Sequence, residues 1–210
     1  MGETTIINTE KFFTEIDLNN NLRENRKKTL LNIVNVIIHE LKSSNQVNLN
    51  FICTHNSRRS QFAQVWAHYA IEYFNLDGIA SYSGGTEVTA MHRNTVKSLR
   101  NVQFKFDVVT FSHENPVYEV TYENNKNSIV AYSKLYDDEF NKKPFIAITT
   151  CDSADKNCPF IPDALKRIHL AYIDPKASDD TPEMSSSYLN TSKEIASEMY
   201  FIFKEVKSQL

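Results

Sequence analysis

Residues 47–60 read Val47-Asn48-Leu49-Asn50-Phe51-Ile52-Cys53-Thr54-His55-Asn56-Ser57-Arg58-Arg59-Ser60. Apolar residues alternate up to Cys53 and return at helical spacing after Arg59, which predicts a strand, a polar turn and a helix. A polar turn at such a junction leaves backbone N–H groups free to point inward, and the helix adds the positive end of its dipole. The stretch therefore predicts a binding site for a tetrahedral oxyanion, with a cysteine beside it.

The side chains of this stretch have expected tasks. Arg59 presents a forked donor that grips two oxygens at once, and the positive field of the turn favours the thiolate of Cys53, the expected nucleophile. Ser60 is placed to donate a hydrogen bond to that thiolate, although a serine at a helix start is often only a cap. The alternative is a small buried cysteine at a strand end, which the strand-turn-helix context disfavours. The expected oxyanion-binding residues are Thr54, His55, Asn56, Ser57, Arg58 and Arg59.

The chain as a whole argues against several classes of protein. Its 210 residues are enough for one domain with a sizeable core, and its formal net charge of −3 argues against broad nucleic-acid binding. The first residues lack the charged and apolar regions of a signal peptide, and no apolar run reaches the roughly 20 residues that span a bilayer. We expect a cytoplasmic protein with no membrane partner and no nucleic-acid partner.

The three cysteines of the chain, Cys53, Cys151 and Cys158, are too few for a secreted disulfide scaffold. Cys151 and Cys158 frame a polar segment after an apolar run, which is compatible with a zinc site, with two unrelated core cysteines or with a redox pair. Structural zinc takes four ligands, usually in close pairs, so we expect no metal and favour the redox pair.

The spacing of Cys151 and Cys158 makes the redox hypothesis specific. A disulfide requires Cα atoms within about 7 Å, whereas seven positions along a helix span roughly 10 Å. If the segment is helical when reduced, it must unwind to form the disulfide. The chemistry would then include a conformational step.

Alternating strand and helix patterns organise the rest of the chain. Residues 1–20 are polar and predict a loosely held extension, and a capping box at residues 191–194 predicts the start of the last helix. Further expected elements are helices at 22–43, 59–74 and 93–102, strands at 47–52, 79–83, 104–111, 145–150 and 167–173, and a β-hairpin with strands at 117–122 and 128–134.

These elements predict an α/β fold, a three-layer sandwich around a central, mainly parallel sheet, with an inserted β-hairpin and an N-terminal helix. We expect an N-terminal helical extension at 1–45 and the main domain at 46–210, with 112–144 as an insertion. Asp174 follows the last expected strand and precedes Pro175, at the rim where sites gather in parallel sheets. It is the candidate acid, although Asp-Pro is also an ordinary turn.

The assembled motifs resemble those of the thioredoxin-coupled arsenate reductases, which share the fold of the low-molecular-weight protein tyrosine phosphatases. The resemblance rests on residues 53–60, 151–159 and 174–175, with support from 83–86. It runs from about residue 49 to the C-terminus, interrupted by 112–144. The second stretch is the most specific, because the phosphatases lack it. His55 stands where the family usually has glycine, and such a side chain is strained if the backbone there needs a positive φ.

The resemblance implies a role for each matched residue. Cys53 would be the nucleophile on arsenate, Arg59 the oxyanion clamp, Ser60 the stabiliser of the thiolate and Asp174 the general acid. Cys151 would attack the Cys53 adduct, which releases arsenite and leaves a Cys53–Cys151 disulfide. Cys158 would then attack Cys151, and thioredoxin would reduce the resulting disulfide, with no cofactor bound.

Two other functions compete with the arsenate reductase that we expect. A phosphatase acting on phosphotyrosine or small phosphoesters would use the same site, because phosphate and arsenate have nearly the same shape. That alternative leaves Cys151 and Cys158 without a task. A non-enzymatic redox sensor, with the extra segments binding a partner, is the third possibility.

Overall fold

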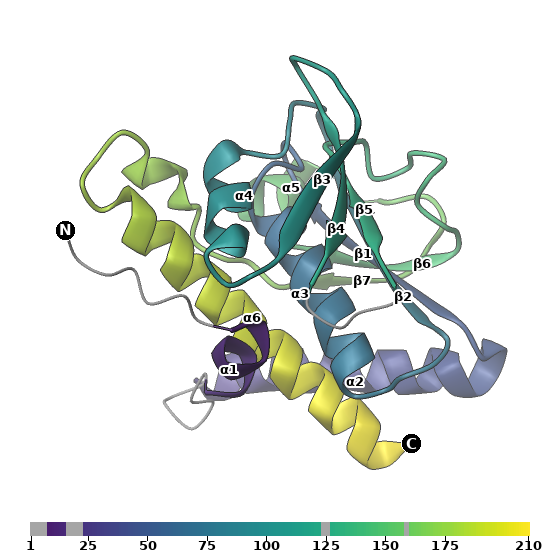
Figure 1. Ribbon diagram of the computed structural model, residues 1–210. Helices are drawn as coiled ribbons and strands as arrows, with labels where there is room; N and C mark the ends of the chain where they lie inside the picture. The colour runs from purple at the N-terminus through teal and green to yellow at the C-terminus, as the bar shows by residue number, and fades with distance from the viewer. Residues whose placement is uncertain (1–7, 16–22, 123–126, 158–159) are drawn as a thin grey trace.

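A four-stranded parallel sheet forms the centre of the computed structural model, which describes residues 8–15, 23–122, 127–157 and 160–210. The strand order is β2-β1-β6-β7, so the expected parallel sheet is confirmed (Figure 1). The strands are β1 (Val47–Cys53), β2 (Ile79–Gly85), β6 (Phe145–Thr149) and β7 (Ala164–His169). Because all four run in the same direction, the carboxyl ends of β1, β2 and β6 meet at one edge, where Cys53 lies beside Gly85.

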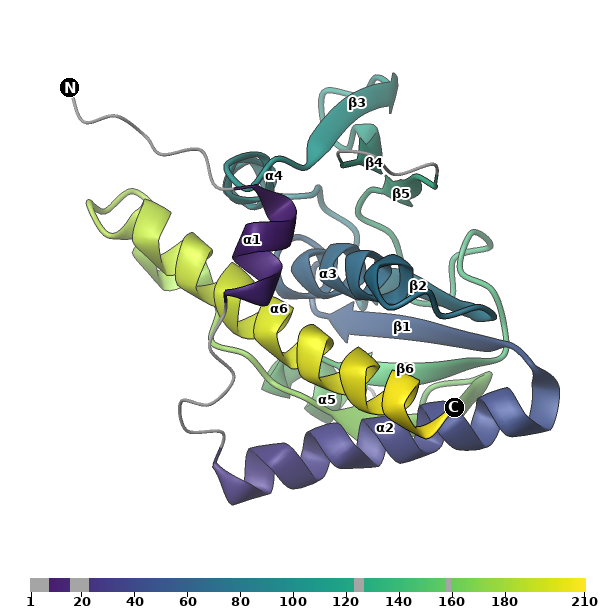
Figure 2. The same cartoon turned by 60° about the horizontal axis from the view of Figure 1, so that its bottom comes forward.

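Three long helices cover one face of this sheet. They are α2 (Glu24–Ser44), α3 (Arg59–Tyr73) and α6 (Met184–Gln209), and α6 packs against both of the others (Figure 2). Leu49 and Phe51 of β1 belong to the large core beneath these helices, whereas Ile52 belongs to a smaller apolar cluster. That smaller cluster also holds residues of β6 and of α5 (Asp152–Asn157). The alternation seen in the sequence therefore separates two cores.

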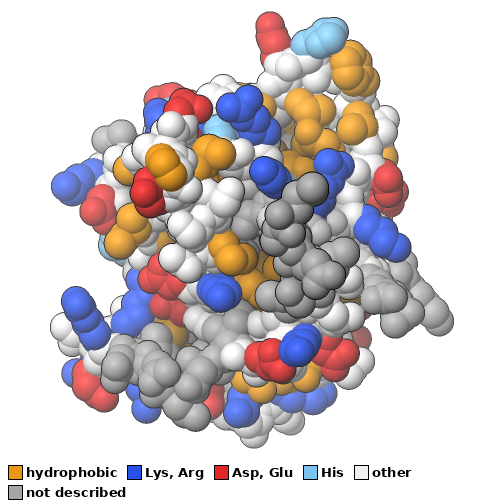
Figure 3. Space-filling view, turned by 60° about the vertical axis from the view of Figure 1, so that its left-hand side comes forward, with side chains coloured by type: hydrophobic (Ala, Val, Ile, Leu, Met, Phe, Trp, Pro, Cys, Tyr) orange, Lys and Arg blue, Asp and Glu red, His pale blue; other side chains and the backbone are white. Residues whose placement is uncertain are grey.

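A second, antiparallel sheet packs outside α3. It consists of β3 (Lys105–Thr110), β4 (Val117–Thr121) and β5 (Ile129–Ala131), so the expected hairpin is confirmed and β3 extends it to three strands. Its buried residues Phe106, Val120 and Ala131 join the large core. Hydrophobic side chains are also exposed at the end of β3 and just after it, where Val108, Val109 and Phe111 are 52%, 54% and 73% exposed. Figure 3 shows hydrophobic side chains gathered in one region of the surface.

The N-terminal segment is held more firmly than we predicted. Residues 9–14 form α1 (Thr9–Thr14), and Asn8 caps it by accepting hydrogen bonds from the Glu10 and Lys11 backbone N–H groups. Phe12 and Phe13 are buried and stack on Trp66, with ring centroids 5.3 and 5.8 Å apart. The prediction of a loose extension at 1–20 is wrong for this helix, because two aromatic side chains in a polar stretch supply enough apolar surface to anchor it.

The last helix begins earlier than its capping box indicated. α6 begins at Met184, and the residues of the expected box, Thr191 and Ser192, lie buried within it. Ser192 accepts a hydrogen bond of 2.9 Å from the Trp66 indole N–H, a partner that no local pattern reveals. The preceding strand also differs from the prediction, because β7 ends at His169 and irregular chain connects it to Asp174.

Two short helices complete the architecture near the carboxyl edge of the sheet. α4 (Arg93–Arg100) follows β2, and the 3₁₀ helix η1 (Pro175–Ser178) follows Asp174. Among the described residues, no helix is both long enough and apolar enough to cross a membrane.

Candidate active site

Cys53 ends β1 at the carboxyl edge of the sheet, and the turn that follows leads into α3. This turn packs tightly against the end of β2. A Cβ atom on Gly85 would lie 2.7 Å from the Thr54 carbonyl oxygen and 2.9 Å from the Asn56 nitrogen, both of them backbone atoms. Only glycine leaves room for the turn at this point, which explains the second glycine of the pair that closes β2.

The thiol of Cys53 is buried and contacts the hydroxyl of Ser60, with an Sγ–Oγ distance of 3.1 Å. The Asn56 side-chain amide donates a hydrogen bond of 2.8 Å to that hydroxyl. Because the hydroxyl oxygen accepts from Asn56, its own proton is available for the sulfur. The structure thus places Ser60 within hydrogen-bond distance of the Cys53 sulfur, with a proton that it can donate there.

Asn56 is the centre of the turn, a role that the sequence alone did not reveal. Its side-chain oxygen accepts hydrogen bonds from the Lys134 backbone N–H at 3.0 Å and from the Gln61 amide at 3.2 Å, which orients its NH₂ group toward Ser60. Its φ is +46°, and asparagine tolerates this left-handed region better than most residues.

The backbone of His55 does not require the glycine-like conformation that we considered. Among the described residues of the turn, Asn56 is the one that has a positive φ. The His55 ring lies 3.3 Å from a carboxylate oxygen of Glu87, and its carbonyl oxygen accepts hydrogen bonds from Thr89 and Ser133. The side chain therefore lies at the rim of the turn without imposing strain.

Arg59 links the turn to the candidate acid. Its guanidinium donates to an Asp174 carboxylate oxygen at 2.6 Å and to the Tyr172 carbonyl oxygen at 3.2 Å. The Arg59 Nε atom is buried and has no hydrogen-bond partner among the described residues. A buried donor without a partner is costly, so an oxyanion oxygen at this position would satisfy it.

Arg58 is turned away from the role that we predicted for it. Its guanidinium donates to the Tyr188 hydroxyl at 2.6 Å and to an Asp179 carboxylate oxygen at 2.8 Å. The Tyr188 hydroxyl in turn donates to Asp179 at 2.8 Å and lies 3.0 Å from the ring of His92, which caps α4. These partners tie the start of α3 to α6 and to the segment after Asp174.

The charges of this cluster stabilise one another. Burial alone would raise the pKa of Asp179, but the Tyr188 hydrogen bond and the Arg58 charge outweigh it and lower that pKa. Burial raises the pKa of Tyr188 to about 12, so its hydroxyl is protonated at neutral pH. Burial, together with the positive charge of Arg58, lowers the pKa of His92. Arg58 therefore acts in this structure as a structural cation and its charge is already paired.

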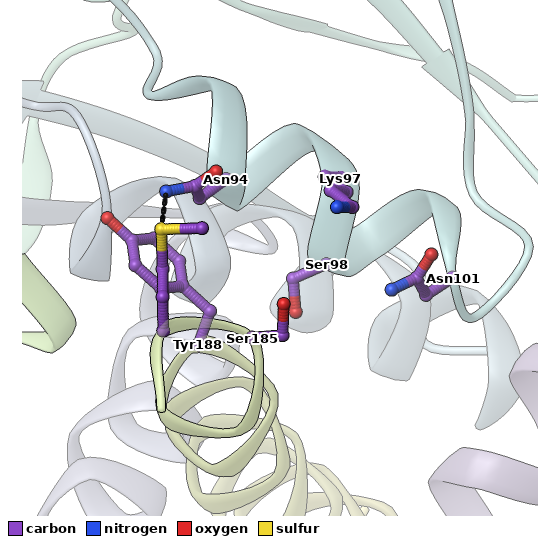
Figure 4. A pocket seen from close by; sticks show the side chains of 7 residues that line it. Asn94, Lys97, Ser98, Asn101, Ser185 and Tyr188 are labelled. Carbon is purple, nitrogen blue, oxygen red and sulfur yellow. Dashed lines mark hydrogen bonds between the residues drawn. The ribbon is translucent and has the colours of Figure 1, made fainter. Parts of the chain in front are cut away.

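A narrow crevice lies on the other side of Tyr188, between α4 and α6. Its volume is about 20 Å³, and Asn94 crosses its end with a hydrogen bond of 3.0 Å to the Met184 sulfur (Figure 4). A space of this size holds about one water molecule. It is therefore not a substrate site.

Cys151 follows β6 and lies in the same apolar cluster as Cys53. Its sulfur is 3.5 Å from the Thr54 hydroxyl, so the residue directly after Cys53 contacts the second cysteine. The Ala154 backbone N–H also donates to the Cys151 sulfur at 3.3 Å. Both cysteines are buried and carry free thiols. Cys158 lies outside the described residues.

The segment after Cys151 is helical, as the conformational hypothesis requires for the reduced protein. Asp155 anchors this helix, α5, to the strands below it: Thr149 donates to its carboxylate at 2.8 Å, and Arg167 donates to the same carboxylate. Burial would raise the pKa of Asp155, but these two hydrogen bonds outweigh it and lower that pKa. Unwinding of α5 would have to break these contacts.

Ser57 contributes to the turn through its hydroxyl, which donates to the Ala90 carbonyl oxygen at 2.6 Å. Sequence reasoning missed Asn56 as the organiser of the turn, Gly85 as its support, and the Tyr188–Asp179 pair. The Gly-Gly pair at the end of β2 was the one available signal. The described residues contain no group of three or more His, Cys, Asp or Glu side chains placed to hold a metal ion.

Comparisons with known proteins address both the fold and the chemistry. The solved low-molecular-weight protein tyrosine phosphatase of Bacillus subtilis has a TM-score of 0.51 and 13% identity to the chain, and the match covers 77% of this chain and 98% of that one. The corresponding protein of Vibrio cholerae O395 has a TM-score of 0.50 at 12% identity, covering 74% and 93%. The fold is that of the low-molecular-weight protein tyrosine phosphatases.

The sequence of the chain is similar to that of arsenate reductases. The chain is 27% identical to an arsenate reductase of Staphylococcus aureus strain N315 over 129 residues, which are 61% of this chain and 79% of that protein. No family model matches the chain. The predicted resemblance to arsenate reductases is confirmed by this relative.

Proposed function

We propose that this protein is an arsenate reductase that uses Cys53, Cys151 and Cys158 in sequence and receives electrons from thioredoxin. The observation that carries the proposal is the contact between Cys151 and Thr54, because it brings a second free thiol to the residue beside the nucleophile. The similarity to arsenate reductases supports the same conclusion.

In the first step, the Cys53 thiolate attacks arsenate, and one oxygen leaves as water with a proton from Asp174. Ser60 stabilises the thiolate, and its contact of 3.1 Å supports that role. The backbone of residues 54–59 and the Arg59 Nε atom hold the remaining oxygens, which would satisfy a buried donor. Asp174 accepts a hydrogen bond from Arg59, so clamp and acid are coupled from the start.

In the second step, the Cys151 thiolate attacks the Cys53 sulfur. The sulfur–arsenic bond breaks and its electron pair stays on arsenic, so arsenate becomes arsenite and two thiols become the Cys53–Cys151 disulfide. Cys158 then attacks Cys151, which releases the Cys53 thiolate, and thioredoxin supplies the two electrons that reduce the Cys151–Cys158 disulfide. This last step requires α5 to unwind.

A phosphatase is the second candidate, and the shared fold favours it. Hydrolysis would use Cys53, Arg59 and Asp174 but neither of the other cysteines. The two functions are separated by measuring arsenite release with thioredoxin and NADPH-driven recycling beside hydrolysis of an aryl phosphate. Cys151→Ser and Cys158→Ser should abolish arsenite turnover and spare hydrolysis. Unchanged arsenite turnover in both variants would disprove the relay.

A further inference from the structure

A groove lies beside the oxyanion-binding turn and is much larger than a bare arsenate or phosphate ion requires. Its volume is about 530 Å³, within the range of sites that take small organic molecules. The turn itself contributes His55, Ser57 and Arg58 to the lining, and the segment between β3 and β4 contributes His113, Glu114 and Pro116. Neither Cys53 nor Arg59 lines the groove, which is therefore adjacent to the oxyanion site and distinct from it.

The wall between β3 and β4 is fixed to the turn by hydrogen bonds. Asn115 donates to the Ser133 carbonyl oxygen at 2.8 Å and accepts from the Ser133 backbone N–H at 3.2 Å. The fully buried Ser133 hydroxyl donates to the His55 carbonyl oxygen at 2.9 Å and accepts from the Thr89 backbone N–H at 2.9 Å. One serine therefore connects the second sheet, the β2–α4 loop and the oxyanion-binding turn, which makes the groove a preformed feature.

The remaining lining of the groove carries positive charge. Arg93, at the start of α4, and Lys176, in η1, both line it, and neither forms an ion pair within the described part of the chain. The charge of Arg58 is neutralised by Asp179, and Glu114 is the one acidic residue in the lining. Two unpaired cations beside a site for an oxyanion attract a second negative group on the same ligand.

We propose that this groove is an anion-binding subsite, and that the protein binds organic phosphates or arsenates whose organic part carries a second negative group, such as a carboxylate. The oxyanion would occupy the turn, and the second group would meet Arg93 and Lys176. The proposal goes beyond arsenate reduction: it concerns binding at the mouth of the same site and needs neither Cys151 nor Cys158.

The test compares the binding of phenyl phosphate and 4-carboxyphenyl phosphate to the Cys53→Ser protein by calorimetry, with inorganic phosphate as the reference ligand. We expect the carboxylate to strengthen binding by about two- to five-fold for each cation that it meets, since both side chains are exposed. Arg93→Gln and Lys176→Gln should each reduce that preference and leave the affinity for inorganic phosphate unchanged. The preference should also shrink as salt is added.

Lys97→Gln is the matched control, because Lys97 is an exposed cation of the same helix α4 that does not line the groove. Equal binding of the two aryl phosphates to the parent protein would overturn the proposal. So would an equal loss of preference in Lys97→Gln, which would indicate a general field rather than a subsite. If no phosphate bound at all, both the oxyanion site and the groove would be wrong. If the preference held while arsenite release failed, only the reductase proposal would be wrong.

Discussion

The Ser60 hydroxyl lies 3.1 Å from the Cys53 sulfur and accepts a hydrogen bond from the Asn56 amide. The Asn56 amide is in turn oriented by hydrogen bonds to its own side-chain oxygen from Lys134 and Gln61. The Ser60 oxygen therefore accepts from a chain of contacts that begins in the backbone of a distant segment, and its own proton is available to the sulfur. Such a chain holds a donor at the sulfur before any substrate binds.

Ser60→Ala removes that donor from the Cys53 sulfur. We expect alkylation of Cys53 by iodoacetamide at neutral pH to slow by roughly ten-fold, because a hydrogen bond to a charged group stabilises it by about 1.5–3 kcal/mol. Ser57→Ala is the matched control, since the Ser57 hydroxyl bonds to the Ala90 carbonyl oxygen and not to the sulfur. Equal alkylation rates in the parent protein and Ser60→Ala would contradict the assignment.

Gly85→Ala tests the support of the oxyanion-binding turn. The added methyl group would lie 2.6 Å from the Glu87 carbonyl oxygen and 2.7 Å from that of Thr54, and neither backbone atom yields easily. We expect affinity for inorganic phosphate to fall by at least about ten-fold as the turn shifts. Urea unfolding of the same variant establishes that it is folded. A folded variant with the parent's phosphate affinity would show that the turn does not depend on this glycine.

Arg58→Met tests the cluster around Tyr188. Removal of the cation leaves Asp179 partly buried without its ion pair, and we expect a loss of about 2–4 kcal/mol in the free energy of unfolding at pH 7. The pKa of Asp179 is lowered by folding, so its pairing stabilises the fold above roughly pH 4 and is lost as the pH falls further. The variant should therefore lose less stability than the parent on acidification below pH 4.

Arg93→Met is the control for this measurement, because Arg93 is exposed and forms no ion pair within the described residues. Its free energy of unfolding should change by no more than about 0.5 kcal/mol. If Arg58→Met changed the free energy of unfolding as little as Arg93→Met, Arg58 would not be the structural cation that its contacts indicate.

Burial of the Lys134 ammonium group, near the candidate active site, destabilises the folded protein. Its side chain is 1% exposed, its Nζ atom has no hydrogen-bond partner among the described residues, and the rings of Tyr132 and Phe140 lie beside it. Burial lowers the pKa of Lys134 to about 8, although Asp138 partly opposes the shift. Between about pH 8 and pH 10 the unfolded chain retains this proton and the folded chain releases it, so stability rises with pH.

Lys134→Met removes that ammonium group and fills the same space. We expect the free energy of unfolding at pH 7 to increase by on the order of 2 kcal/mol, and the alkaline rise in stability to disappear. Urea titrations at pH 7 and at about pH 9.5 measure both effects. If the stability of the variant still increased from pH 7 to about pH 9.5 as that of the parent does, another group would be responsible.

The sequence predicted those features of the site that depend on near neighbours. The alternation before Cys53, the polar turn and the helix after Arg59 are local patterns, and the structure has all three. The position of Arg58 in the turn predicts that it binds the oxyanion. Its observed partners, Asp179 and Tyr188, are 121 and 130 residues away. No spacing rule links residues so far apart.

The same limit explains the errors in the helices. The expected capping box at 191–194 is a valid local signal, but burial of Ser192 against Trp66, 126 residues away, places it inside α6. Phe12 and Phe13 occur in a polar segment, and their contacts with Trp66 and with other aromatic rings of α3 and α6 show why α1 forms. Long-range packing decided both cases.

In the proposed relay, Cys151 attacks the sulfur of the Cys53–arsenate adduct within one protein molecule. The most direct measurement treats the reduced Cys158→Ser protein with arsenate in the absence of thioredoxin, quantifies arsenite, and maps disulfides by peptide mass spectrometry. The account predicts one arsenite per protein molecule and a trapped Cys53–Cys151 disulfide, with no further turnover. Absence of arsenite, or arsenite released while Cys151 remains a free thiol, would contradict it.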